Sequence, residues 1–143
     1  MADLPTGTVT FLFTDIEGST RLWEQHPQAM AGALARHDSI LRQATAAHQG
    51  VAFRTAGDAF CTAFASAPQA LHAALDAQRA LTSEAWGVVG GVPVRMAVHT
   101  CTAVPEDGDY RTGALNRLGR LLGAVHGGQI VLCLLYTSDA ADE

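Results

Sequence analysis

The sequence contains no lysine, and other absences narrow what kind of protein it encodes. Its nine basic residues are all arginine and form no basic run, and fourteen acidic residues give a net charge of −5. Binding to nucleic acid or to an acidic membrane surface is therefore not expected. Three cysteines without a CxxC pair argue against a zinc knuckle or a disulfide framework.

Long apolar runs are also missing. No stretch approaches the length that spans a bilayer, and the first residues lack the charged and apolar regions of a signal peptide, so we expect a cytoplasmic protein. The composition, with 48% hydrophobic and 16% charged residues over 143 positions, is typical of one soluble globular domain with a real core. We place that domain at residues 1–132 and interpret 133–143 as an atypical tail, because "LLYTSDAADE" continues no predicted element.

Apolar periodicity predicts five strands and four helices. In chain order these are a strand at 8–13, helices at 19–27 and 30–48, strands at 51–55 and 59–64, a helix from 68, a strand at 92–100, a helix at 114–125 and a strand at 127–132. The order contains the β-α-β-β-α-β pattern of a ferredoxin-like sheet, with one extra helix after the first strand. In that topology the end of the first strand and the turn of the hairpin meet at one edge, so Asp15 and Asp58 should be neighbours in space.

The stretch "FTDIEGST" at 13–20 follows an apolar run with an acid and then with small residues. Taken alone, Asp15 and Ser19 can be turn and helix-capping residues. Asp58 can likewise be a simple hairpin residue, and Arg120 a solvated charge on a helix. Arg54 can pair with a neighbouring carboxylate. The two tryptophans are better explained by packing than by stacking on a base.

Four motifs that occur in this order favour a functional interpretation over these structural ones: "FTDIEGST", "TAGDAF", "GDY" and "LNRLGRL". Together they resemble the class III adenylate and guanylate cyclase catalytic domain, in its bacterial form beginning "FLFTDIEGSTRLWE", over about residues 7–132. The resemblance implies an α+β fold with a ferredoxin-like, antiparallel-rich sheet, incomplete at its C-terminal end. It also implies an enzyme that converts ATP or GTP to a 3′,5′-cyclic monophosphate and pyrophosphate.

The same resemblance implies a metal site. Asp15 and Asp58 fall on the two aspartates that bind a pair of Mg²⁺ or Mn²⁺ ions, and the Ile16 carbonyl falls on a further ligand. Hard cations of this kind take carboxylate and carbonyl oxygens. Gly18 allows close backbone approach, and with Ser19 and Thr20 it would place helix N-terminal amides against the triphosphate.

Four further residues match positions that contact the nucleotide in the family. Arg54 and Asp109 fall on base-recognising positions, and Asn116 falls on the residue that orients the ribose. Arg120, four residues later on the same helix face, matches an arginine that stabilises the transition state.

The resemblance further implies a homodimer and fusion to regulatory domains downstream. Two departures leave a second hypothesis open. Arg111 and Thr112 stand where the family usually has an aromatic residue and a glycine, and a phosphate-binding lysine of the family has no counterpart. The alternative is a catalytically impaired, cyclase-like regulatory module that binds nucleotide or a protein partner.

Overall fold

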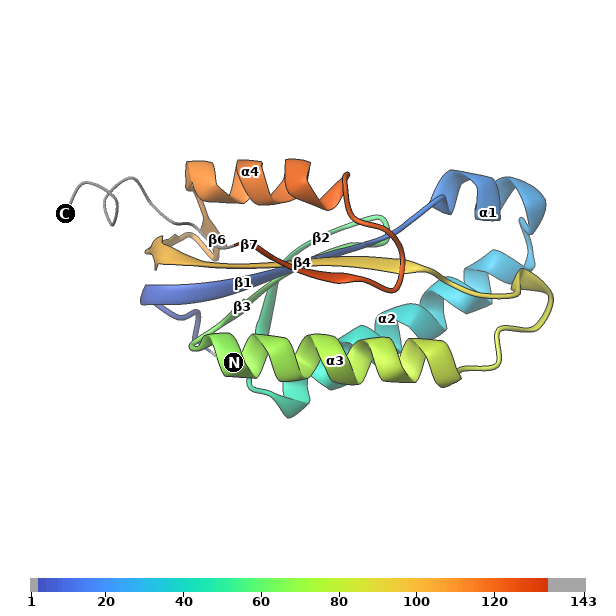
Figure 1. Ribbon diagram of the computed structural model, residues 1–143, viewed down its shortest axis with the longest axis horizontal. Coiled ribbons are helices and arrows are strands. Elements are labelled where there is room, and N and C mark those ends of the chain that lie inside the picture. The colour runs from blue at the N-terminus through green and yellow to red at the C-terminus, as the bar shows by residue number, and fades with distance from the viewer. Residues whose placement is uncertain (1–2, 134–143) are drawn as a thin grey trace.

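A five-stranded sheet with helices on both faces forms the centre of the molecule, in a computed structural model that describes residues 3–133 (Figure 1). The elements in chain order are β1 (Gly7–Ile16), α1 (Ser19–Gln25), α2 (Ala29–Ala47), β2 (Val51–Ala56), β3 (Ala59–Phe64), α3 (Ala67–Ser83), the 3₁₀ turn η1 (Gly87–Val89), β4 (Val94–Ala103), β5 (Pro105–Glu106), β6 (Asp109–Tyr110), α4 (Gly113–Leu122) and β7 (Ile130–Cys133).

The strand order is β2-β3-β1-β4-β7, with β1 in the middle. Every pair is antiparallel except β4 with β7, which is parallel. β1 and β4 pair along their whole length, from Gly7 opposite Ala103 to Ile16 opposite Val94. The predicted α+β fold, with the first strand antiparallel to the strand that follows the hairpin and helix, is confirmed.

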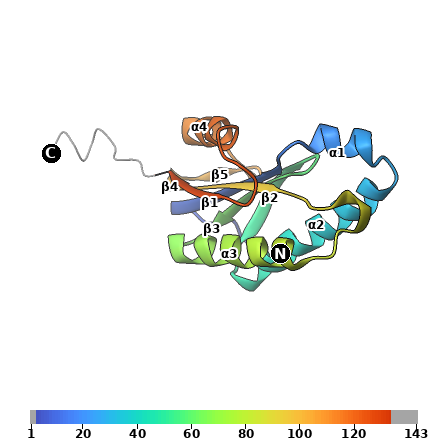
Figure 2. The same ribbon diagram turned by 45° about the vertical axis from the view of Figure 1, so that its right-hand side comes forward.

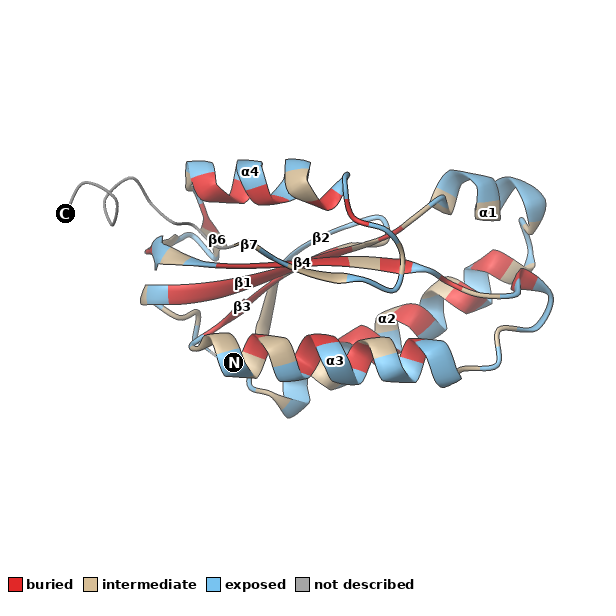
Figure 3. Cartoon of the chain, in the orientation of Figure 1, coloured by how far each residue is buried: buried red, intermediate tan, exposed pale blue. Residues whose placement is uncertain are grey.

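Each face of the sheet has its own core (Figure 2). Phe11 and Phe13 of β1 point to the face covered by α4, whereas Leu12 and Ile16 point to the face covered by α2 and α3. This division follows from the period of two in a strand. Figure 3 shows the buried strands between the helical layers and an α4 that is buried only on its sheet side.

Three local differences from the predicted elements bear on function. β1 does not end before Asp15 but runs on to Ile16. Arg95 of β4 lies directly opposite Asp15 and neutralises its charge across the strand pair. The predicted Asp- and Gly-rich loop contains the small hairpin β5–β6, whose turn residues Asp107 and Gly108 both have positive φ, 52° and 77°. β7 includes Cys133, the first residue of the predicted tail; residues 134–143 lie outside the described residues.

Candidate functional site

The two predicted metal aspartates lie at one end of the sheet, which we call the carboxylate end (Asp15, Asp58 and the Ile16 carbonyl). The pairing of Thr14 with Phe60 places Asp15 beside the β2–β3 turn that carries Asp58. Gly57 opens this turn with φ 59°, a conformation that glycine adopts without strain. By the alternation of β1, Asp15 shares the α4 face with Phe13.

Arg95 of β4 lies directly opposite Asp15 and is the main feature that the sequence did not reveal. Its Nε and Nη2 donate to the two carboxylate oxygens of Asp15 at 2.7 and 2.6 Å. This bidentate bond is the largest cause that raises the pKa of Arg95, and the charges of Glu17 and Asp58 add to it. Both aspartates of the carboxylate end therefore lie within the field of one guanidinium.

Glu17 fixes the backbone that follows Asp15. Its amide donates to the Pro93 carbonyl at 2.9 Å, and its carboxylate accepts from the Gly127 amide at 2.9 Å. The Gly127 hydrogen bond is the main reason why the pKa of Glu17 lies below its ordinary value. Gly127 packs so closely on Pro93 that a Cβ there would lie 2.3 Å from the proline ring. Glu17 thus ties the loop after β1 to the loop before β7.

The donors of the carboxylate end fit a hard divalent cation bound together with a substrate. In the part of the chain that the structure describes, no three His, Cys, Asp or Glu side chains form a ready metal cage. Ile16 has a buried side chain, so only its backbone can serve as a ligand. Two carboxylates and a carbonyl are a typical protein share for Mg²⁺, which completes its shell with phosphates and water. The negative charge of this end is also what holds the Arg95 guanidinium there.

Gly18 precedes α1 with φ 69° and acts as its N-cap without any side-chain hydrogen bond. Ser19 is the first residue of the helix, so the capping interpretation of Ser19 is wrong. A left-handed backbone at this position favours glycine over any other residue. The turn places Gly18, Ser19 and Thr20 directly after the carboxylate end.

A second cluster lies beside the start of α4 and consists of Arg54, Asp109, Tyr110 and Asn116. We call it the base pocket after the predicted, base-recognising role of Arg54 and Asp109. Arg54 Nη2 donates to Asp109 Oδ1 at 2.8 Å and to the Tyr110 carbonyl at 3.3 Å. Asp109 also accepts from the Tyr110 amide at 2.8 Å. Burial alone would raise the pKa of Asp109, but that amide and Arg54 outweigh it, so the pKa lies below its ordinary value. The prediction that Arg54 pairs with a nearby carboxylate is confirmed.

A β-bulge explains how Arg54 reaches this pocket. The register of β2 against β3 shifts between Ala52 and Arg54, so Phe53 has no partner of its own. Phe53 packs edge-to-face on Tyr110, and the guanidinium of Arg54 lies 5.7 Å from the Phe53 ring centre. Two consecutive side chains thus turn toward the same cluster, which an unbroken strand does not permit. A cavity of about 360 Å³ opens beside Arg54, bordered by Arg111 and Asn116.

Asn116 and Arg120 are exposed on the outer side of α4, whereas Leu115, Leu118 and Leu122 anchor the helix to the sheet. The Thr112 hydroxyl accepts from the Ala114 amide and begins the helix. Within residues 3–133, the structure brings Asn116 to the base pocket but brings neither Asn116 nor Arg120 into hydrogen-bonding contact with Asp15 or Asp58.

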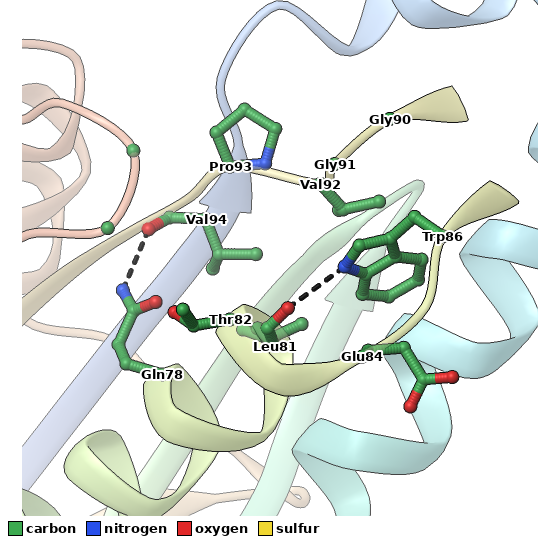
Figure 4. Close-up of a pocket in the computed structure, with 12 residues that line it drawn as sticks. Gln78, Leu81, Thr82, Glu84, Trp86, Gly90, Gly91, Val92, Pro93 and Val94 are labelled. Carbon is green, nitrogen blue, oxygen red and sulfur yellow. Dashed lines mark hydrogen bonds between the residues drawn. The ribbon is translucent and has the colours of Figure 1, made fainter. Parts of the chain in front are cut away.

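Another cavity, of about 430 Å³, is lined by none of the predicted site residues (Figure 4). Its polar groups are bonded within the chain: Gln78 donates to the Val94 carbonyl, and the Trp86 indole donates to the Leu81 carbonyl. The packing role predicted for Trp86 is confirmed, whereas Trp23 is exposed and packs in neither core of the described residues, so that interpretation is wrong for Trp23. The Gln78 hydrogen bond joins α3 to β4, and the Trp86 hydrogen bond joins the segment before η1 to the last turns of α3.

Comparison with known proteins agrees with this architecture. Residues 1–104 match the family model described as the adenylate and guanylate cyclase catalytic domain. The chain belongs to this family. An uncharacterized protein of Mycobacterium tuberculosis is 41% identical over 130 residues, which cover 90% of this chain and 43% of the relative. Adenylate cyclase of Lachancea kluyveri is 34% identical over 160 residues, covering 94% of this chain and 9% of that protein. The chain thus spans less than half the length of these relatives.

Solved cyclase domains share the fold. An adenylate cyclase of Trypanosoma brucei, solved in its monomeric state, has a TM-score of 0.83 at 26% identity, over 92% of this chain and 74% of that one. The monomeric guanylyl cyclase domain of a fusion protein from the fungus Blastocladiella emersonii has a TM-score of 0.76 at 17% identity, covering 89% and 81% of the two chains. Among the residues described here, no helix combines the length and the apolar character needed to cross a membrane.

Sequence reasoning missed Arg95 and Glu17. The alternation of Val94, Met96 and Val98 already puts Arg95 on the opposite face from the α3-side core. This alternation does not give the register of β1 on β4. The register decides that Arg95 lies opposite Asp15 rather than opposite Phe13.

Proposed function

We propose that the chain is a nucleotidyl cyclase domain that converts ATP, or GTP as the second candidate substrate, to the 3′,5′-cyclic monophosphate and pyrophosphate. The observation that carries this proposal is the arrangement on one sheet face. That face has the carboxylate end beyond one end of α4 and the base pocket at the other, with Asn116 and Arg120 along the helix.

The reaction joins the ribose 3′-oxygen to the α-phosphorus and breaks the bond from that phosphorus to the bridging oxygen of pyrophosphate. The 3′-hydroxyl loses its proton, and pyrophosphate leaves with the electron pair. Mg²⁺ or Mn²⁺ ions, when bound, lower the pKa of the hydroxyl and neutralise the leaving oxygens. Asp15, Asp58 and the Ile16 carbonyl would hold those ions, and the turn at Gly18, Ser19 and Thr20 leaves room for the phosphates.

The remaining residues would orient the substrate and stabilise charge. Arg54 donates and Asp109 accepts, so the two offer complementary hydrogen bonds to a purine edge once their own ion pair opens. Asn116 would hold the ribose. Arg120 carries a permanent, planar charge suited to the oxygens of the α-phosphoryl group in the transition state.

A two-fold homodimer would complete two such sites. Arg120 is exposed on the outer side of the helix that covers the face bearing Asp15. A second copy that packs face to face would bring the partner's helix over the carboxylate end, which is the self-complementary contact of a two-fold dimer.

The alternative is a cyclase-like module that binds nucleotide without turnover. One observation favours it: Asp15 and Asp109 are both already ion-paired inside the chain, to Arg95 and Arg54.

One assay separates the two hypotheses. The purified protein is incubated with ATP or GTP and Mn²⁺, and cyclic product and pyrophosphate are measured in parallel with binding of a fluorescent nucleotide. The cyclase proposal expects equimolar cyclic nucleotide and pyrophosphate. Nucleotide binding without either product would support the module instead. Absence of both binding and product would contradict both hypotheses.

A further inference from the structure

Asp15 and Arg95 form the most completely engaged ion pair at the carboxylate end. They are direct cross-strand partners on β1, the central strand, and its neighbour β4, near one end of the β1–β4 ladder. Two hydrogen bonds join them. Their side chains are 22% and 21% exposed. A pair this sheltered is less weakened by solvent than an ordinary surface pair. The β1–β4 ladder runs through this pair to Ile16 opposite Val94, and it fixes the backbone positions of the two residues.

The bond uses the same atoms that a cation would need. Both oxygens of Asp15 accept from the guanidinium, so their lone pairs in that direction are occupied. The guanidinium also carries a positive charge, which repels a dication placed at the same carboxylate. Asp58 and Glu17 lie close enough to stabilise the charged Arg95 as well. Arg95 therefore neutralises Asp15 and partly offsets the charge of its acidic neighbours.

We propose that Arg95 is a built-in competitor for the divalent cation, and that its guanidinium must swing off Asp15 before a metal ion binds there. This inference rests on the proposed metal site at Asp15 and Asp58. It adds a regulatory property to that site: in the absence of substrate, the carboxylate end is held closed to free Mg²⁺ or Mn²⁺ by a side chain of the same chain.

The competition predicts a gain of metal binding when the arginine is removed. Arg95→Gln keeps polar atoms on a shorter side chain but removes the charge and the paired donors. We expect it to bind Mn²⁺ about tenfold more tightly than the wild type without any nucleotide, because a strong charge-assisted bond no longer has to break. Arg95→Lys keeps a charge without the two-pronged geometry and should lie between the two.

The measurement is a titration of the free protein with Mn²⁺, followed by the electron paramagnetic resonance signal of the unbound ion. Arg79→Gln, which removes an exposed arginine on α3, is the matched control and should bind as the wild type does. Melting temperatures with and without Mn²⁺ give a second readout that does not depend on activity. Mn²⁺ should raise the melting temperature of Arg95→Gln more than that of the wild type.

The double variant Asp15→Asn with Arg95→Gln locates the effect, because it should lose the gain. Equal Mn²⁺ affinity in Arg95→Gln and the wild type, with binding lost in Asp15→Asn, would overturn the competition while leaving the metal site intact. A gain that persists in the double variant would also overturn it. If neither the wild type nor Arg95→Gln binds Mn²⁺ in the absence of nucleotide, the competition is overturned, whereas a metal site that forms together with the bound triphosphate is not.

Discussion

Two arginine–aspartate pairs mark the two ends of one sheet face, and they are built differently. Arg95 and Asp15 sit on long, regularly paired strands, share two hydrogen bonds and are about one-fifth exposed. Arg54 and Asp109 sit on a bulged strand and a two-residue strand, share one hydrogen bond and are 43% and 36% exposed. The first pair is held by the sheet, whereas the second can open at little cost. The carboxylate end should therefore tolerate less change than the base pocket.

The largest effect is expected at the carboxylate end. Asp15→Asn and Asp58→Asn should each lower cyclase activity by about 100-fold or more, because each removes a carboxylate that would hold the metal ions whose charge balances the leaving pyrophosphate. The assay is formation of cyclic nucleotide in Mn²⁺. Asp76→Asn removes an aspartate that is paired with His48 on the other side of the sheet, and it should keep wild-type activity. Near wild-type turnover in either site variant would contradict the assignment.

The next effect tests whether the face is shared between two copies. Asp58→Ala and Arg120→Ala should each be inactive alone, yet a mixture should recover about a quarter of the wild-type activity. Half of the dimers formed are mixed, and each has one intact site out of two. Activity of the wild type should also fall on dilution through the dimer dissociation constant. Mass spectrometry would show whether the mixture contains mixed dimers. No recovery in such a mixture would mean that Asp15, Asp58, Asn116 and Arg120 all act within a single chain's site.

A smaller effect is expected at the base pocket. Arg54→Lys replaces a planar donor by a single point charge and should change the ATP-to-GTP ratio of kcat/KM by roughly threefold to tenfold. The loss of total activity should be smaller than for the aspartate variants. Arg79→Lys serves as the control. An unchanged ratio would mean that Arg54 does not read the base.

The smallest effect concerns stability near the base pocket. Burial raises the pKa of Tyr110 to about 12 from an ordinary value of 10, so the folded state favours the neutral phenol. Tyr110 contributes stability that is complete below about pH 10 and is lost as pH rises through about 12. Melting temperatures between pH 8 and 12 should fall less steeply for Tyr110→Phe. Cys61, whose pKa burial raises to about 11, titrates in the same window, so both proteins should carry Cys61→Ala.

The strands that carry the two arginine–aspartate pairs could largely be predicted from the sequence. Alternation and helical periodicity predicted every strand of the main sheet, and the hairpin "TAGDAF" predicted that Asp58 lies near Asp15. The two arginine partners were harder to predict. The partner of Asp15 depends on a register set by ten consecutive β1–β4 pairs, which no local pattern specifies. The position of the Arg54 side chain depends on a β-bulge in β2, and a residue pattern of period two does not predict a bulge.

The bulge at Phe53 also has a consequence for how this domain can change over evolutionary time. An ordinary substitution in β2 alters one side chain, but the loss of one residue here would restore the alternation and turn either Phe53 or Arg54 to the other face of the sheet. Such a deletion would leave β1, β4 and the carboxylate end in register. A single codon is thus enough to exchange the residue at the predicted base-recognising position while Asp15 and Asp58 keep their places.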